Sequence, residues 1–117
     1  MTTHRGMFLR SSRDIEWVKR RGRRLSTNWF NLLACRRDDP ATQVGIIVGR
    51  RFGVAVRRNQ AKRIFRELVR HCHDDLLPGH LVLVFPKRDA LIQPYAELKR
   101  IWEASLLRCH LLRPRSD

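Results

Sequence analysis

A dense run of basic side chains between Arg50 and Arg70 is the part of the sequence best suited to chemistry with another molecule. Within it stand eight Lys or Arg residues and a single acidic residue, Glu67. The basic residues are Arg50, Arg51, Arg57, Arg58, Lys62, Arg63, Arg66 and Arg70. Arginine presents a planar fork of N–H donors that fits phosphate oxygens, and repulsion among like charges falls when counter-charges arrive. We therefore expect a nucleic acid as the partner, although a solvated charged face is the ordinary interpretation of one basic helix.

The same region carries apolar residues at helical spacing. They stand at i, i+3, i+4, i+7 and i+11 and are Ala61, Ile64, Phe65, Leu68 and Cys72. Arg58, Lys62 and Arg66 are four residues apart, so they form one row on the surface of such a helix. The spacing predicts a helix over residues 57–73 with one face packed on a sheet and the other face cationic.

The whole chain is strongly basic, with 25 Lys and Arg against 11 Asp and Glu and a formal net charge of +14. Such an excess repels itself in a compact protein unless a polyanion lies alongside. An acidic membrane surface is the competing partner, but no run of about 18 apolar residues exists and the basic helix needs its apolar face for a core, so we expect no membrane partner. The basic amino terminus lacks the apolar stretch of a secretory signal, and we expect a cytoplasmic protein.

The residue types that usually carry catalysis or bind metals are scattered. Cys35, Cys72 and Cys109 are odd in number and lack CxxC spacing, so we expect reduced core residues rather than disulfides or a zinc site. No nucleophile with its base is recognisable, and the pair Asp74-Asp75 is typical of a polar turn. We expect no catalytic residue, no metal site and no tightly bound cofactor in the protein.

Elements before the basic region must position it. Residues 12–20, with Ser12 as a cap and Gly22 as a stop, predict a short first helix. Two strands are predicted by the aromatic and apolar residues 28–35 and by the β-branched run 44–48. Because a gap of hairpin length separates them, we expect these two strands to pair antiparallel.

Elements after the basic region complete the fold. Residues 80–85 predict a buried central strand, and the apolar spacing between Pro94 and Pro114 predicts a final helix. A further short strand is expected at residues 25–27 or 50–52. The order then reads α-β-β-β-α-β-α, which is a single-domain α+β protein.

The segment from Gly45 to Glu67 resembles the signature of the bacterial ribonuclease P protein. The matching parts are a strand followed by two basic residues, then Gly53-x-Ala55-Val56, Arg58-Asn59, Lys62-Arg63 and Arg66-Glu67. The resemblance extends more loosely over nearly the whole chain and implies one domain over residues 1–117, with flexible tails at 1–8 and 113–117. The implied fold is an α-β-β-β-α-β-α sandwich with a four-stranded mixed sheet, in which the basic helix connects parallel strands by a left-handed crossover, against the usual rule.

In this family the basic helix contacts a catalytic RNA subunit. Carried over to this chain, the expected contacts are Arg50, Arg51, Arg57, Arg58, Asn59, Gln60, Lys62, Arg63, Arg66 and Arg70. Asn59 is equally well explained as a helix-cap or first-turn residue. The family usually has arginine where this chain has Gln60, so one charged contact is in doubt, and Arg57 is a candidate to compensate for it.

The resemblance also implies a cleft, formed by the first helix and the sheet, that holds the single-stranded 5′ leader of precursor tRNA. The expected cleft residues are Ile15, Lys19, Trp29, Asn31 and Leu33. Strand alternation places Trp29 on the same face as Asn31 and Leu33, where an indole can stack on an unpaired base. A tryptophan half-buried on a sheet explains Trp29 equally well.

The implied activity is endonucleolytic removal of the 5′ leader by a ribonucleoprotein that requires no second protein. Its chemistry is expected to lie with Mg²⁺ held mainly by RNA. Two other classes remain open: a structural RNA-binding protein would not affect this cleavage, and a metal-dependent nuclease would cleave RNA alone. A helix-turn-helix DNA-binding protein is disfavoured, because strands rather than a second helix flank the basic helix.

Overall fold

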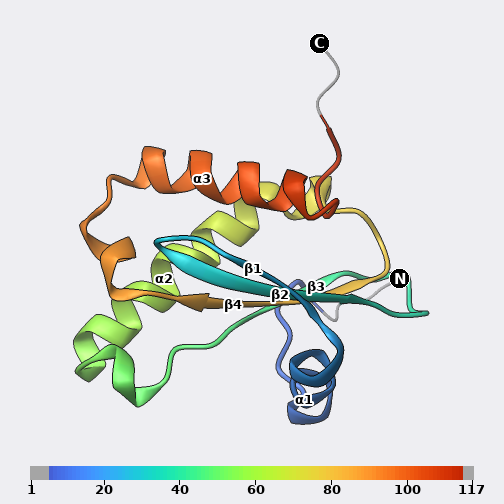
Figure 1. Ribbon diagram of the computed structural model, residues 1–117, viewed down its shortest axis with the longest axis horizontal. Coiled ribbons are helices and arrows are strands. Elements are labelled where there is room, and N and C mark those ends of the chain that lie inside the picture. Colours follow the sequence, from blue (N-terminus) through green and yellow to red (C-terminus); the bar gives the residue numbers. More distant parts are fainter. Residues whose placement is uncertain (1–5, 115–117) are drawn as a thin grey trace.

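A computed structural model describes residues 6–114, which form a four-stranded sheet with helices on both faces (Figure 1). In chain order the elements are α1 (Ser12–Arg21), β1 (Arg23–Ser26), β2 (Phe30–Arg36), β3 (Gln43–Ile46), α2 (Ala55–Cys72), β4 (His80–Pro86) and α3 (Tyr95–Arg108). Short 3-10 turns follow β3, α2 and β4 and are η1 (Arg50–Phe52), η2 (His73–Asp75) and η3 (Arg88–Ile92). This order confirms the predicted α+β fold. Of the two places expected for a further short strand, residues 23–26 form it, and residues 50–52 form a 3-10 turn instead.

The order of strands in the sheet is β1-β2-β4-β3. β4 pairs antiparallel with β2 and parallel with β3, so the predicted antiparallel pairing of β2 with β3 is wrong. The segment between these two strands does not close a hairpin; it bonds to the turn before β4, where Arg37 N–H donates to Gly79 O and Gly79 N–H donates to Pro40 O, each at 2.9 Å. Because the four residues 81–84 of β4 are buried, this strand needs a partner on either side.

Most of α2 and all of α3 lie on one face of the sheet, where they enclose the main core (Figure 1). Three aromatic rings meet there edge to face, with centroid distances of 5.5 Å for Phe30–Trp102, 5.7 Å for Phe30–Phe65 and 6.0 Å for Phe65–Trp102. Trp102 has no exposed surface, and its indole N–H donates to the Cys72 sulfur at 3.4 Å. Buried indoles usually find such a partner, so this face is both apolar and satisfied in its hydrogen bonds.

Of the helices that the structure describes, α1 covers the opposite face of the sheet, and Leu9 packs there beside it (Figure 1). The N-cap of α1 is Ser11, whose hydroxyl accepts from Asp14 N–H at 3.3 Å, so the predicted cap at Ser12 was placed one residue late. The helix ends at Gly22 as predicted. A Cβ there would lie 2.7 Å from Val18 O, so only glycine lets the chain turn so tightly from α1 into β1.

The predicted flexible tails, 1–8 and 113–117, are too long. Val44 N–H donates to Met7 O and Leu9 N–H donates to Val44 O, so the chain around Phe8 lies parallel to β3 at the edge of the sheet. At the other end Arg113 N–H donates to Asp75 O at 2.8 Å. The rest of the predicted tails, 1–5 and 115–117, lies outside the described residues. Among the helices that the structure describes, none has the length and apolar character needed to cross a membrane.

Candidate nucleic-acid interface

Helix α2 presents an apolar side to the core and a basic side to solvent. Its buried residues are Ala61, Phe65, Leu68, Val69 and Cys72, which confirms the predicted stripe except that Ile64 is only half-buried. Its exposed polar residues include Arg57, Asn59, Gln60, Arg63, Arg66 and Arg70. The amphipathic spacing of the sequence thus fixes which side of the helix is available to a ligand.

The first turn of α2 is held by one of its own arginines. Val54 is the N-cap and supplies no side-chain hydrogen bond, while Arg58 is half-buried and donates from Nη1 to Gly53 O at 2.6 Å. Gly53 has a φ of +148°, which side chains rarely allow. Arg58 therefore has a structural role beside its expected RNA contact. Since α2 begins at Ala55, Asn59 is neither a cap nor in the first turn, and the alternative explanation for Asn59 is wrong.

Charge on this side of α2 is almost uncompensated. Glu67 is the acidic residue of the helix, and its carboxylate lies 3.6 Å from Arg70 Nη1 and 3.1 Å from His71 Nε2. The Arg70 guanidinium also lies over the Phe8 ring, 5.7 Å from its centroid. By contrast, Arg63 and Arg66 form no ion pair with any residue between 6 and 114. The middle of the helix is thus where phosphate would gain most from binding.

Residues near the start of α2 extend the cationic surface. Arg50 and Arg51 are exposed in η1, and the Arg51 carbonyl accepts from Arg88 Nη2 at 3.0 Å. This bond places the η3 arginine beside η1, a neighbour that sequence spacing gives no sign of. Gln60 lies three residues from both Arg57 and Arg63, so it sits between two exposed arginines on the helix surface.

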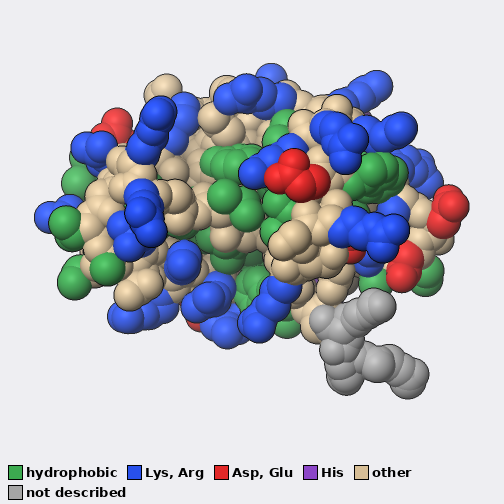
Figure 2. Space-filling view, turned by 90° about the horizontal axis from the view of Figure 1, so that it is seen from below, with side chains coloured by type: hydrophobic (Ala, Val, Ile, Leu, Met, Phe, Trp, Pro, Cys, Tyr) green, Lys and Arg blue, Asp and Glu red, His purple; other side chains and the backbone are tan. Residues whose placement is uncertain are grey.

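The face of the sheet beside α1 is only partly covered. Asn31 and Leu33 are half-buried there, and Asn31 pairs across the strands with Phe85, which is also half-buried. The Asn31 Oδ1 atom is buried and has no hydrogen-bond partner among the described residues. On α1, Ile15 is half-buried and Lys19 is exposed, with Lys19 Nζ 3.8 Å from a Glu16 oxygen. Seen from the side of α1, apolar side chains occupy the middle of this face and Lys and Arg surround them (Figure 2).

Trp29 does not lie on this face, so its predicted placement by strand alternation is wrong. It precedes β2, in a turn where the Thr27 hydroxyl accepts from Trp29 N–H at 3.1 Å and Phe30 N–H at 2.9 Å. The turn breaks the alternation, and the indole packs against the main core with Phe30. Sequence reasoning missed Phe85, although extending the alternation of β4 from Leu83 would have found it.

The described residues offer little nucleophilic or metal-binding chemistry. Burial raises the pKa of all three thiols, Cys35, Cys72 and Cys109, so each stays protonated at neutral pH. All three cysteines are free, and the predicted core placement is confirmed for Cys72, whereas Cys35 and Cys109 are half-buried. Within residues 6–114, no three His, Cys, Asp or Glu side chains are grouped so that they could share a metal ion.

Similarity to known proteins agrees with this geometry. The pattern of the family described as Ribonuclease P matches residues 3–110. The ribonuclease P protein component of Oleidesulfovibrio alaskensis is 41% identical over 69 residues, a stretch covering 57% of this chain but little more than half, 55%, of that protein. The corresponding protein of Finegoldia magna is 30% identical over 109 residues, covering 93% of this chain and 90% of its own length. The solved structure of the RNase P protein from Thermotoga maritima is 27% identical and has a TM-score of 0.77 over 86% of this chain and 96% of that one.

Proposed function

The chain belongs to the ribonuclease P protein family, and from this premise we propose that it is the protein subunit of a ribonuclease P that removes the 5′ leader of precursor tRNA. The observation that carries the proposal is the basic side of α2, which is exposed and has Glu67 as its single acidic residue. A helix of this kind gains free energy by replacing condensed counterions on an RNA backbone. The activity is that of a ribonucleoprotein endonuclease located in the cytoplasm.

The RNA subunit would bind along the basic side of α2. The proposed contacts are Arg50, Arg51, Arg57, Arg58, Asn59, Gln60, Lys62, Arg63, Arg66 and Arg70. Arg58 and Arg70 already have partners within the protein, so their loss should weaken RNA binding less than the loss of Arg63 or Arg66. The unpartnered arginines can offer both donors of the guanidinium fork to one phosphate.

The leader would lie on the partly covered face of the sheet beside α1. Leu33 and Ile15 supply apolar contact there, Lys19 can neutralise a phosphate, and the Phe85 ring can stack on an unpaired base. Asn31 adds a buried oxygen with no partner, which can accept a hydrogen bond from a base amino group. Trp29, which packs on the other face, is not part of this proposed cleft.

The phosphodiester chemistry would belong to Mg²⁺ held mainly by the RNA subunit and the substrate. The protein's contribution is then electrostatic and positional: it reduces repulsion between two polyanions and holds the leader in place. Because the protein replaces counterions on both RNAs, the holoenzyme should need less Mg²⁺ than the RNA subunit alone. No second protein is required for this role.

The decisive experiment is cleavage of a precursor tRNA at low Mg²⁺ by a bacterial ribonuclease P RNA, with and without the protein, beside a protein-only control. We expect leader removal only when both components are present. Cleavage by the protein alone would make it a metal-dependent nuclease instead. Tight RNA binding without stimulation would place it among structural RNA-binding proteins.

A further inference from the structure

A second group of arginines lines a groove beside β1. β1 is the outer strand at the edge of the sheet farthest from β3. The groove has a volume of about 900 Å³ and lies between β1 and the end of α3. Its arginines are Arg21, Arg23, Arg24, Arg36 and Arg108. His80 and His110 also line it, and no Asp or Glu between residues 6 and 114 does. The groove is therefore a concave surface of one charge sign, a shape that concentrates the electrostatic potential.

The five arginines come together from four separate elements. Arg21 ends α1, and the tight turn at Gly22 leads directly into the pair Arg23-Arg24 on β1. Arg36 is the last residue of β2, and Arg108 is the last residue of α3. The fold thus brings Arg36 and Arg108 to three arginines that are already close in the sequence.

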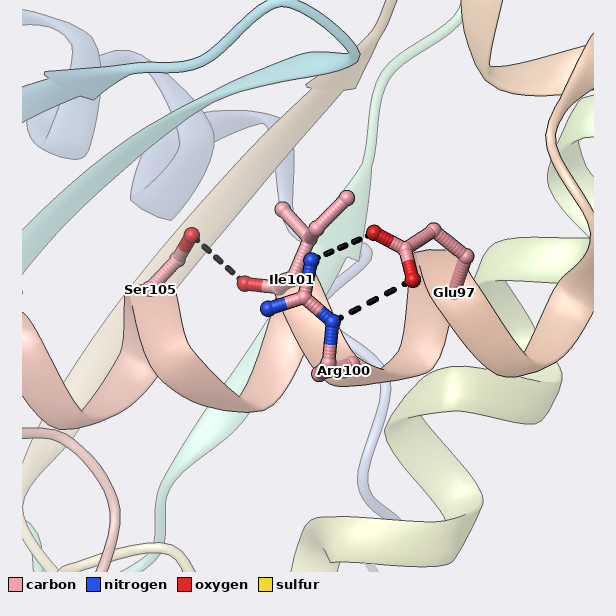
Figure 3. A network of polar contacts seen from close by, with 4 residues as sticks. All are labelled: Glu97, Arg100, Ile101 and Ser105. Atoms are coloured by element: carbon pink, nitrogen blue, oxygen red, sulfur yellow. Dashed lines mark hydrogen bonds and ion pairs between the residues drawn. The ribbon is translucent and has the colours of Figure 1, made fainter.

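None of these five side chains has an acidic partner among the described residues. No ion pair or side-chain hydrogen bond within residues 6–114 involves them, and all five are exposed. The Arg21 guanidinium lies over the Trp17 ring, 5.9 Å from its centroid. Other arginines are satisfied internally, as Arg100 shows by its two hydrogen bonds to Glu97 on α3 (Figure 3). That pairing holds the pKa of Glu97 below its usual value. The groove thus concentrates positive charge that no acidic side chain of the described residues neutralises.

The groove and the first turns of α2 face different regions of space. α2 begins beyond the end of β3, whereas the groove includes His80, where β4 begins. β3 and β4 are parallel, so the two cationic surfaces lie toward opposite ends of these strands. The groove also adjoins β1, which is the outer strand on the other side of the sheet. A ligand on the start of α2 therefore leaves the groove free.

We propose that this groove is a further RNA-binding site, which takes the phosphate backbone of an RNA segment distinct from those on α2 and on the face beside α1. The choice of RNA as the ligand rests on the proposed function, and phosphodiester groups match the guanidinium forks of five unpaired arginines. The segment can belong to the RNA subunit or to the folded body of the precursor tRNA. A protein with two such surfaces joins two RNA segments that would otherwise repel each other.

The test is the triple variant R23Q/R24Q/R108Q against the control triple K99Q/R100Q/R113Q, which removes the same charge outside the groove. Binding is measured over a range of salt concentrations with three ligands. The RNA subunit alone is titrated with protein, and reconstituted holoenzyme is titrated with precursor tRNA and with leaderless tRNA. Three lost phosphate contacts should weaken the affected complex on the order of 100-fold near 0.1 M salt and lower its salt slope by about 2 to 3.

The ligands separate the two sources of phosphate. Weaker binding of the RNA subunit, with substrate binding intact at saturating protein, assigns the groove to that subunit. If the RNA subunit binds normally but precursor tRNA and leaderless tRNA both bind less tightly by the same factor, the groove is assigned to the tRNA body. Equal effects of the two triple variants on every ligand overturn the proposal. A wild-type protein that binds RNA but fails to stimulate cleavage would overturn the proposed function instead. The cleavage assay detects that outcome independently of these binding measurements.

A second variant guards against damage to β1. R21Q/R108Q changes only the last residues of two helices, and its thermal unfolding should match that of the wild-type protein. Because it removes two arginines rather than three, it should lower the salt slope of RNA binding by about two thirds as much as the triple variant does. An unchanged slope in this folded variant would also overturn the proposal.

Discussion

The two faces of the sheet are built for different purposes. On the face covered by α2 and α3, the side chains of Trp102, Phe65 and Phe30 have no exposed surface. On the face beside α1, Phe85 is left half-buried and Asn31 keeps a buried oxygen without a partner. The comparison indicates that the sealed face supplies stability, while the partly open face leaves apolar surface and an unpaired hydrogen-bond acceptor, which the proposed leader site would use.

The largest effect should come from opening the sealed face. Trp102→Ala removes a side chain with no exposed surface and should lower the free energy of unfolding by about 3 to 5 kcal/mol. Urea denaturation measures this loss. Trp17→Ala is the matched control, because Trp17 is only half-buried at the edge of the α1 side and should cost about 1 to 2 kcal/mol. Equal costs for the two variants would remove the distinction between the faces.

Changes on the solvent-exposed side of α2 should affect RNA binding rather than the stability of the fold. R63Q/R66Q removes two exposed arginines that have no ion pair among the described residues. Affinity for the ribonuclease P RNA should fall roughly 50-fold near 0.1 M salt, and the salt slope should fall by about 2. Filter binding measures both quantities. R100Q on α3 is the control, and a loss as large in R100Q would show that net charge alone matters.

The partly open face should respond in leader binding. Phe85→Ala removes a ring from this face, and the holoenzyme should bind a precursor tRNA less tightly by about 1 to 2 kcal/mol if the ring stacks on a base. Leaderless tRNA serves as the comparison ligand, since its affinity should not change. If both ligands weaken equally, the leader does not contact Phe85.

The smallest effect should follow from adding a charge. Q60R places a third cation between the exposed residues Arg57 and Arg63. RNA-subunit affinity should rise about fivefold near 0.1 M salt, with the salt slope steeper by about 1. An unchanged slope would show that no phosphate lies near this position, and the double variant R57Q/Q60R would then show whether Arg57 occupies the contact instead.

The elements that the sequence predicts well are those with local periodicity. α2 follows from its apolar spacing, and β4 follows from an unbroken apolar run. The pairing of β2 was predicted wrongly because the position of β4 between two strands depends on burial of distant residues, not on the length of the β2–β3 connection. The mixed sheet was predicted by the family resemblance and not by the spacing of residues. The left-handed β3-α2-β4 crossover, which the resemblance also implies, stays a prediction.

The same distinction between local periodicity and contacts of distant residues separates the site residues that were predicted correctly from those that were not. The arginines of α2 other than Arg58, which is half-buried, were correctly expected on an exposed helix face, because spacing along one helix is enough to place them. Trp29 was misplaced because a turn held by the Thr27 hydroxyl ends the alternation before β2 begins. In the groove beside β1, Arg36 and Arg108 could not be grouped from the sequence with Arg21, Arg23 and Arg24, because they come from the ends of distant elements.

The segment around Phe8 has a consequence for solubility. An outer strand with free N–H and C=O groups is a template on which other chains can polymerise. At β3, the protein's own Met7 and Leu9 occupy the groups of Val44, and at β1 the short outer strand carries Arg23 and Arg24. Both open edges of the sheet are thus shielded, one by backbone and one by charge. This shielding protects the protein against aggregation by strand addition.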